Sequence, residues 1–166
     1  MRDGTAAGEH RRRRARGDKG VALVEFAIVA PLVFMLILGS ITAGVSLSRK
    51  NSMTNAVREG SRFGATLSND GAWANDVRDR VLDLAAGDLT SAQVCVKLVQ
   101  APATEIAASS CPTELAGLEP DVTGVTAGEC AVLVWARRTS KIEAIVYSDN
   151  VTLDSRSISR YERECP

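Results

Sequence analysis

The sequence contains very little histidine and few aromatic residues. Its single histidine, His10, lies in an arginine-rich segment near the start, and aromatic residues make up 4% of the 166 residues. Ser-His-Asp or Cys-His catalysis and histidine-ligated zinc sites need an imidazole in the folded part, so the composition disfavours them. The shortage of aromatic side chains disfavours a stacking surface for single-stranded nucleic acid or for a sugar.

Motifs for nucleotide, metal or hydrolytic chemistry are also missing. The sequence has no glycine-rich phosphate loop, no G-x-S-x-G and no closely spaced C-x-x-C pair. We therefore predict that the protein is not an enzyme, that it has no catalytic residues, no metal site and no cofactor, and that it does not bind nucleic acid.

The charges are balanced overall but unevenly distributed. Lysine plus arginine and aspartate plus glutamate each number 20, yet residues 1–19 carry seven basic and three acidic groups. The length suits one ordinary domain at most. The chain therefore begins with a short basic segment attached to a mildly acidic remainder.

An uncharged run of 23 residues, Phe26 to Ser48, follows this basic segment. As a helix it is about 35 Å long, which exceeds the roughly 30 Å of bilayer hydrocarbon. A buried core helix is one alternative, but such helices normally carry polar positions every turn. A cleaved secretory signal is the other, although its apolar part is usually only about 7 to 15 residues long. We predict a single membrane span.

The flanking charges predict the orientation of this span. Six basic residues lie at positions 11–19, whereas Arg49 and Lys50 are followed only by Arg58 and Arg62. Because lysine and arginine near a span stay on the cytoplasmic side, the N-terminus should be cytoplasmic and the C-terminal part exported. All cysteines fall in that exported part, where disulfides can form.

A glycine and a glutamate mark the inner end of the apolar segment. Gly20 directly follows the basic segment, and Glu25 lies five positions later among apolar residues. Glycine leaves the backbone free to extend into a protease cleft. Cleavage after it would create an amine on Val21, one helical turn from Glu25 or within reach of the Glu25 of a neighbouring subunit.

This arrangement resembles the type IV prepilin signature of a basic leader, a glycine, a cleavage point and a glutamate at the fifth mature position. More narrowly, GVALVEFAIVAPLVFMLILG and AVREGSRFGA are similar to TadE/TadF-type pseudopilins of tight-adherence (Flp) pilus systems. The resemblance covers roughly residues 17–66. It implies an accessory, pilin-like subunit of the bacterial plasma membrane that assists pilus assembly.

The resemblance also implies partners and roles for individual residues. A prepilin peptidase would cleave between Gly20 and Val21, and Glu25 would act in processing or subunit docking. Other pilus assembly subunits, and the major Flp pilin, would be partners within the membrane. Pro31 removes one backbone hydrogen bond and should bend the helix locally.

The remaining residues predict an α+β fold. The first helix should continue over 51–67, and a second should carry Trp73, Val77, Val81 and Leu84. Alternating or β-rich patterns predict strands at 93–99, 130–136, 142–147 and 151–159, with a loop at 101–129. We thus divide the chain into a basic cytoplasmic leader (1–20), a transmembrane helix with its extension (21–67), and an exported domain (68–166) with a short antiparallel sheet of three or four strands.

Four cysteines, Cys95, Cys111, Cys130 and Cys165, permit three complete pairings. We predict two disulfides, one joining Cys111 to Cys130 or Cys95 and the other holding Cys165, each contributing about 2 to 4 kcal/mol. Unpaired, reduced cysteines are the alternative.

A second functional hypothesis is a membrane-anchored, exported ligand-binding module or enzyme. Its motivation is only the size of the segment 68–166, in which the sequence shows no active-site motif.

Overall fold

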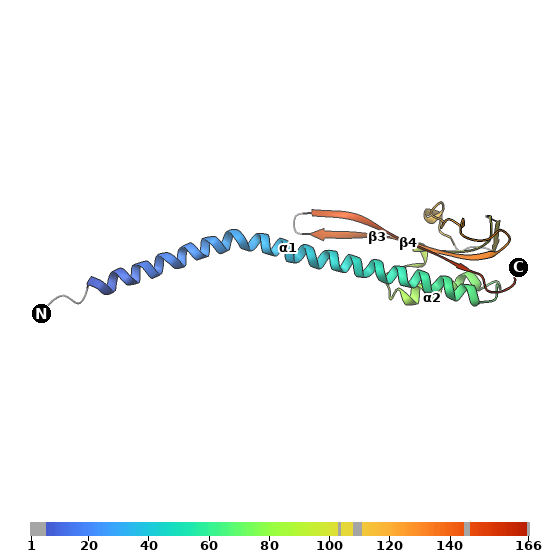
Figure 1. Cartoon of the computed structure of the whole chain (residues 1–166), viewed down its shortest axis with the longest axis horizontal. Helices are drawn as coiled ribbons and strands as arrows, with labels where there is room; N and C mark the ends of the chain where they lie inside the picture. Colours follow the sequence, from blue (N-terminus) through green and yellow to red (C-terminus); the bar gives the residue numbers. More distant parts are fainter. Residues whose placement is uncertain (1–5, 103, 108–110, 145–146, 166) are drawn as a thin grey trace. The chain divides into compact units, whose positions relative to one another are not determined.

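A computed structural model describes residues 6–102, 104–107, 111–144 and 147–165. The chain divides into two compact units, residues 1–43 and 44–166. The helices and strands, labelled in Figure 1, are α1 (Ala6–Thr66), α2 (Trp73–Leu84), β1 (Val94–Gln100), β2 (Thr104–Ala107), β3 (Cys130–Ala144) and β4 (Tyr147–Arg160).

The four strands form one antiparallel sheet in the order β2-β1-β3-β4. A long apolar helix followed by a small domain with a four-stranded antiparallel sheet is the architecture that the sequence predicts, so the predicted fold class is confirmed.

Two strand assignments differ from the sequence prediction. The separate strands predicted at 130–136 and 142–147 belong largely to the single strand β3, and Ile145 and Val146 lie outside the described residues. β3 stays paired with β4 from Ala131 to Ala144, and Arg137 on β3 forms an ion pair across the hairpin. The strand continues through Arg137 and Arg138, a charged stretch with no strand pattern of its own, because it is paired with β4 there. The second difference is β2, which lies inside the segment predicted as loop.

One face of the sheet packs against the helices. Trp73 and Val77 of α2 and Val57 of α1 have at most 1% of their surface exposed. The strands contribute alternate apolar residues to the same core: Val94, Val96, Leu98, Val132, Val134, Ala136 and Leu153. This alternation is what places one side of each strand against the helices.

The opposite face of the sheet is covered by the segment between β2 and β3. Trp135 is 1% exposed, and its indole Nε1 donates a hydrogen bond to the carbonyl of Leu115 at 3.1 Å. Leu115 is itself buried against this face. Lys97 on β1 forms ion pairs with Glu105 on β2, at 3.2 Å, and with Glu119 of the covering segment. Both faces of the sheet are therefore shielded from water at β1 and the first half of β3, whereas Ile158 of β4 is 36% exposed.

Two disulfides connect these parts. Cys95 of β1 is bonded to Cys111 of the covering segment, and Cys130 of β3 is bonded to Cys165 near the C-terminus. The first bond attaches the covering segment to the sheet. The second holds the C-terminal residues beside the start of β3.

Two glycines allow α1 to approach its neighbours closely. A Cβ added to Gly60 would overlap the side chain of Val81 on α2. At Gly64 an added Cβ would lie 2.8 Å from a Val77 methyl and 3.1 Å from a Val132 methyl. Both distances are shorter than ordinary carbon contacts, so larger residues do not fit without movement of buried side chains.

The C-terminal end of α1 is capped entirely by other parts of the domain. Four carbonyls at a helix end lack intrahelical donors. Here the carbonyls of Gly64, Ala65 and Thr66, and that of Leu67 directly after the helix, accept hydrogen bonds from Trp73 Nε1, the Glu162 amide, Arg163 Nε and the Tyr161 hydroxyl, in that order, at 2.9 to 3.0 Å. Three of the four donors follow β4, so the C-terminal segment fixes where α1 ends.

A cluster of three serines connects α1 to β4. Ser61 is fully buried, and its Oγ lies 2.8 Å from Ser157 Oγ and 2.9 Å from Ser159 Oγ. The same hydroxyl donates to the carbonyl of Arg58 at 2.8 Å. Burial of these hydroxyls is tolerated because they hydrogen-bond to one another.

The close approach at Gly60 predicts that Gly60→Ala destabilises the protein. On helix propensity alone this change stabilises by about 0.5 to 1 kcal/mol. Overpacking against the buried, branched Val81 should reverse the sign and cost about 1 to 3 kcal/mol. Thermal unfolding of the full chain in detergent, followed by tryptophan fluorescence, measures the difference. Gly60→Ala combined with Val81→Ala should lose less than the sum of the two single changes, and additive losses would contradict the predicted overlap.

The ion pair across the hairpin predicts a dependence of stability on pH. Arg137 donates to both oxygens of Asp154, at 2.7 and 2.9 Å, and this hydrogen bonding lowers the pKa of Asp154 below its ordinary value despite partial desolvation. Arg156 and Lys50 lower this pKa further. Because the folded-state pKa is depressed, the stabilisation is present above about pH 4 and is lost as the pH falls through the folded-state pKa.

A double-mutant cycle with Arg137→Gln and Asp154→Asn measures this interaction. The coupling between the two changes should be present at pH 7, should begin to fall below about pH 4, and should be lost as the pH falls through the lowered folded-state pKa of Asp154. A coupling that is the same at pH 7 and pH 3 would contradict the assignment.

Candidate functional site

The apolar portion of α1 is exposed on every side. An 18-residue window within Gly20–Thr66 has a mean hydropathy of 2.7, and none of it is buried. Leu36, Ile37 and Leu38, which point in successive directions around the helix, have 72%, 50% and 40% of their surface exposed. Among the residues described, this is the one helix long and apolar enough to cross a membrane. Such a surface requires lipid or other apolar helices around it.

Polar side chains within this segment hydrogen-bond to their own helix. Ser40 Oγ donates to the carbonyl of Leu36 at 2.7 Å, and Thr42 Oγ1 donates to the carbonyl of Leu38 at 2.9 Å. These bonds satisfy both hydroxyls without water. The two polar residues are therefore compatible with an apolar environment.

Gly20 lies inside α1, and the structure keeps it accessible. A Cβ at Gly20 would meet no heavy atom within 4 Å, and Val21 has 60% of its surface exposed. The backbone here is helical, whereas the sequence analysis considered an extended backbone in a protease cleft. Glycine is among the weakest helix formers, at a cost of about 1 kcal/mol relative to alanine, so the helix opens more easily at Gly20 than it would at an alanine.

Glu25 is exposed on the same helix, four residues after Val21. Residues four apart lie on one face of an α-helix, so an amine on Val21 and the Glu25 carboxylate would be neighbours. The flanking large residues on this stretch, Leu23 and Phe26, are 69% and 68% exposed. The Glu25 carboxylate is therefore surrounded by an apolar helix surface.

Pro31 lies within α1, and the helix continues past it. Proline has no amide hydrogen, so the carbonyl of Ala27 loses its usual intrahelical donor. The helix is therefore locally weaker at this point, without being interrupted.

The predicted site residues fall into two groups. Gly20, Val21, Glu25 and Pro31 all lie on α1 in the unit 1–43, whereas the four cysteines lie in the unit 44–166. The contacts that the sequence did not predict are those at the end of α1, where the C-terminal segment supplies most of the caps. No local pattern signals such bonds, because the partners are about 95 residues apart in the chain.

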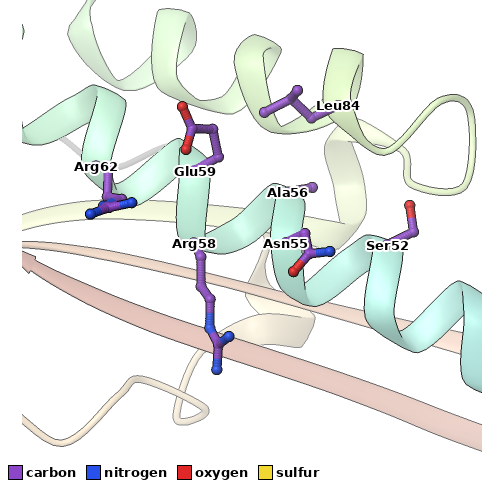
Figure 2. Close-up of a pocket in the computed structure, with 7 residues that line it drawn as sticks. All are labelled: Ser52, Asn55, Ala56, Arg58, Glu59, Arg62 and Leu84. Atoms are coloured by element: carbon purple, nitrogen blue, oxygen red, sulfur yellow. The ribbon is translucent and has the colours of Figure 1, made fainter.

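A groove in the unit 44–166 lies along α1 beside the end of α2, with a volume of about 500 Å³. Figure 2 shows its lining residues: Ser52, Asn55, Ala56, Arg58, Glu59, Arg62 and Leu84. Arg58 and Glu59 point to different sides of α1 in this view, so the polar groups do not converge on one point. In the parts of the chain that are described, no cluster of three or more His, Cys, Asp or Glu side chains could hold a metal ion.

The model of the TadE-like protein family matches residues 20–62. The match begins at Gly20 and ends within α1, so it covers the apolar segment and most of the packed portion of the helix. The predicted resemblance to TadE-like proteins is thereby confirmed. Searches of the curated proteins and of the solved structures give no match.

The family match and the apolar helix both bear on the function of the chain. The TadE-like family is associated with Tad pili and is not known for enzymatic activity. The chain is similar to this family over residues 20–62, and its N-terminal helix is long and apolar enough to cross a membrane once.

The exposure of the apolar segment predicts that charge in its middle prevents stable anchoring. Val33→Arg with Leu36→Arg should cost about 3 kcal/mol for each arginine, whereas Val45→Arg with Leu47→Arg, near the end of the run, should cost less. The measurement is the fraction of protein that remains in membranes after alkaline extraction. Equal retention of both variants would contradict a membrane span centred on these residues.

Proposed function

We propose that this protein is an accessory, pilin-like subunit in the assembly of a tight-adherence (Flp, type IVb) pilus. A prepilin peptidase removes residues 1–20, a basic cytoplasmic leader. The segment 21–67 anchors the product in the plasma membrane, and the segment 68–166 forms the exported domain. The observation that carries this proposal is the family match, which starts at Gly20 and follows α1.

Accessibility and weak helix propensity support cleavage between Gly20 and Val21. An aspartic peptidase binds its substrate in extended form, so the helix must open at the scissile bond. Gly20 offers no side chain against the cleft and stabilises the helix less than an alanine would. Cleavage leaves a positively charged amine on Val21 at the edge of the apolar segment.

Glu25 is the acidic residue that would form an ion pair with the new amine on Val21. A carboxylate within an apolar, lipid-facing segment costs about 2.5 to 3.5 kcal/mol at the membrane centre and less near its edge. Pairing with the new terminus, in the same chain or in a neighbouring subunit, offsets this cost. Because uncleaved protein lacks the amine, docking through Glu25 follows processing.

The charge distribution supports an N-terminus in the cytoplasm. The basic residues at positions 11–19 outnumber those that closely follow the apolar run. This orientation exports the domain that carries the two disulfides, Cys95–Cys111 and Cys130–Cys165, into an oxidising compartment.

The apolar face of α1 is the proposed docking surface for other pilus assembly subunits and for the major Flp pilin. Gly39 and Gly44 have open space around them, so another helix can approach α1 closely there. Pro31 weakens the helix between this region and Glu25, which eases its movement from the bilayer into an assembly. The additional exported domain suits an accessory role, because the major Flp pilin is little more than its helix.

Processing is tested by co-expressing the full chain with a prepilin peptidase and measuring the mass of the product. We expect a mature protein that begins at Val21. Gly20→Phe should abolish cleavage, whereas Gly17→Phe, the same change three residues earlier, should leave it intact. An unprocessed chain in the wild type, or equal processing of both variants, would count against the proposal.

The docking role of Glu25 is tested in a separate experiment. In cells that assemble the pilus, Glu25→Ala should reduce pilus formation, while the protein still reaches the membrane. Normal pilus formation by this variant would exclude Glu25 from assembly.

A further inference from the structure

We propose that the outer edge of β4, over residues 152–158, binds an acidic, extended segment of another polypeptide, which adds to the sheet as a further strand. Arg156 and Arg58 flank this edge on its two sides and pair with carboxylates of that segment. The inference goes beyond the proposed function and does not depend on cleavage after Gly20.

The outer edge of β4 has unpaired backbone groups. β4 is the last strand of the sheet among the described residues, and its register with β3 is regular throughout. The Tyr161 amide donates a hydrogen bond to the Cys130 carbonyl at 2.8 Å. Because inward and outward groups alternate along an antiparallel strand, the odd-numbered residues 153–159 bond to β3. The even-numbered residues 152–158 therefore direct their N–H and C=O groups to the open edge.

The composition of this edge leaves it able to accept a strand. Residues 151–160 contain no proline, glycine or lysine, and no bulge interrupts the pairing with β3. These are features by which edge strands commonly avoid pairing. Charged residues are present instead, and charge on an edge disfavours strands of like charge while allowing complementary ones. The edge is therefore selective for the charge of its partner.

Two exposed arginines near this edge, Arg58 and Arg156, form no ion pair within the described part of the chain. Most other arginines of the unit 44–166 do form ion pairs. These are Arg78, Arg80, Arg137, Arg138 and Arg160. Asp154, which is close to Arg156 in the sequence, is held by Arg137 at 2.7 and 2.9 Å. Positive charge at this edge therefore exceeds negative charge.

Arg58 flanks the edge from the helix side. Ser61 lies beside Ser157 and Ser159 of β4, whereas Gly60 lies against α2. Around the axis of α1, Ser61 follows Gly60 by about 100°, and Arg58 lies about 60° further in the same sense. Arg58 is therefore on the far side of Ser61 from α2, which is the side of the open edge.

α1 and β4 run in the same direction through this unit. Arg49 Nη1 lies 3.4 Å from Ser140 Oγ, and Ser140 pairs with Val151 of β4. Later in both elements, Ser61 lies 2.8 Å from Ser157, measured between the two Oγ atoms. Levels along the helix can therefore be compared with levels along the strand.

Arg58 and Arg156 lie at about the same level. Arg58 precedes Ser61 by three residues, or about 4.5 Å of helix, which equals between one and two strand residues. Counting this distance back from the middle of residues 157–159 leads to Arg156. Figure 2 shows Arg58 extending to the side of α1 opposite to Glu59. Successive side chains of an added strand alternate between its faces, so adjacent carboxylates reach Arg156 on one face and Arg58 on the other.

An apolar position adjoins Arg156 on the same face of β4. Ile158, two residues later, is 36% exposed. It lines a groove of about 380 Å³ with Asp121, Gly124, Val125, Glu129 and Arg160. An aliphatic side chain two residues from the carboxylate in the added strand covers Ile158. The preferred segment is therefore acidic at its centre, with aliphatic residues at alternate positions.

A second copy of this edge is a poorer complement than an acidic segment. It brings another Arg58 and another Arg156, and its one carboxylate within residues 152–158, that of Asp154, is already paired with Arg137. Like charges placed opposite one another destabilise strand pairing. Charge complementarity therefore favours a different, acidic polypeptide.

The test measures binding of a fluorescein-labelled peptide, TVTEEVTIT, to the full chain in uncharged detergent micelles by fluorescence anisotropy. Two control peptides are TVTQQVTIT, which lacks the carboxylates, and a form of the acidic peptide with N-methylated backbone amides, which cannot pair as a strand. We expect a Kd below about 1 mM for the acidic peptide, binding at least about tenfold weaker for the glutamine peptide, and no binding of the methylated form.

Variants of the protein locate the site. Arg58→Gln with Arg156→Gln should weaken binding of the acidic peptide at least about tenfold, whereas Arg80→Gln, at an exposed arginine of α2, should leave it unchanged. Arg58→Lys with Arg156→Lys keeps both charges and should retain binding. Tryptophan fluorescence during thermal unfolding verifies that each variant is folded, and the lysine variant decides the result if the glutamine variant is not.

Every other outcome overturns the proposal. Absence of binding by the acidic peptide up to about 1 mM excludes the site. Equal binding of the methylated peptide means attraction between charges without strand pairing, and equal binding of the glutamine peptide means that the arginines do not select the partner. If Ile158→Cys links most copies in pairs before peptide is added, the edge belongs to a second copy.

The binding measurement is independent of the proposed function. It uses the purified, unprocessed chain, so failure of cleavage after Gly20 or of pilus formation leaves its result unchanged. Conversely, a chain that is cleaved and assembled normally but does not bind the acidic peptide retains the proposed function and loses only this inference.

Discussion

The structure depends on how α1 is held by the domain that follows it. At Gly60 and Gly64 the helix comes so close to α2 and β3 that a single added methyl group does not fit. Its last three carbonyls, and that of Leu67 directly after it, accept hydrogen bonds from α2 and from the segment after β4. Close packing along the helix and capping at its end leave one position for the second half of α1 on the sheet. The Cys130–Cys165 disulfide secures the segment that supplies most of those caps.

This constraint explains how one helix serves two environments. Residues 44–66 belong to the compact unit that contains the sheet, where Met53 and Val57 are buried in the core. The preceding apolar segment has no such partners, and its large side chains remain exposed. In the proposed function, the exposed segment anchors and docks the protein, while the packed segment carries the exported domain.

Sequence reasoning succeeded where the signal is local. The length of the uncharged run, the position of Gly20 before it and that of Glu25 within it can be read from neighbouring residues, and the family match confirms the resemblance. The spacing of Trp73, Val77 and Val81 predicted α2, because a helix buries residues three or four apart. The reasoning failed in β3, where Arg137 and Arg138 interrupt the strand pattern. There the long pairing with β4, and ion pairs to Asp154 and Asp88, maintain the strand.

The amino-acid sequence alone determined that this chain has a membrane-length apolar helix, a basic segment before it and an α+β domain. Hydrophobicity, charge and periodicity act over neighbouring residues, and no distant partner alters them. Only the tertiary structure decided where α1 ends, why Gly60 and Gly64 must be small, and which cysteines are bonded. Each of these features depends on atoms that are distant in the chain, and their positions are established only when the sheet and helices pack together.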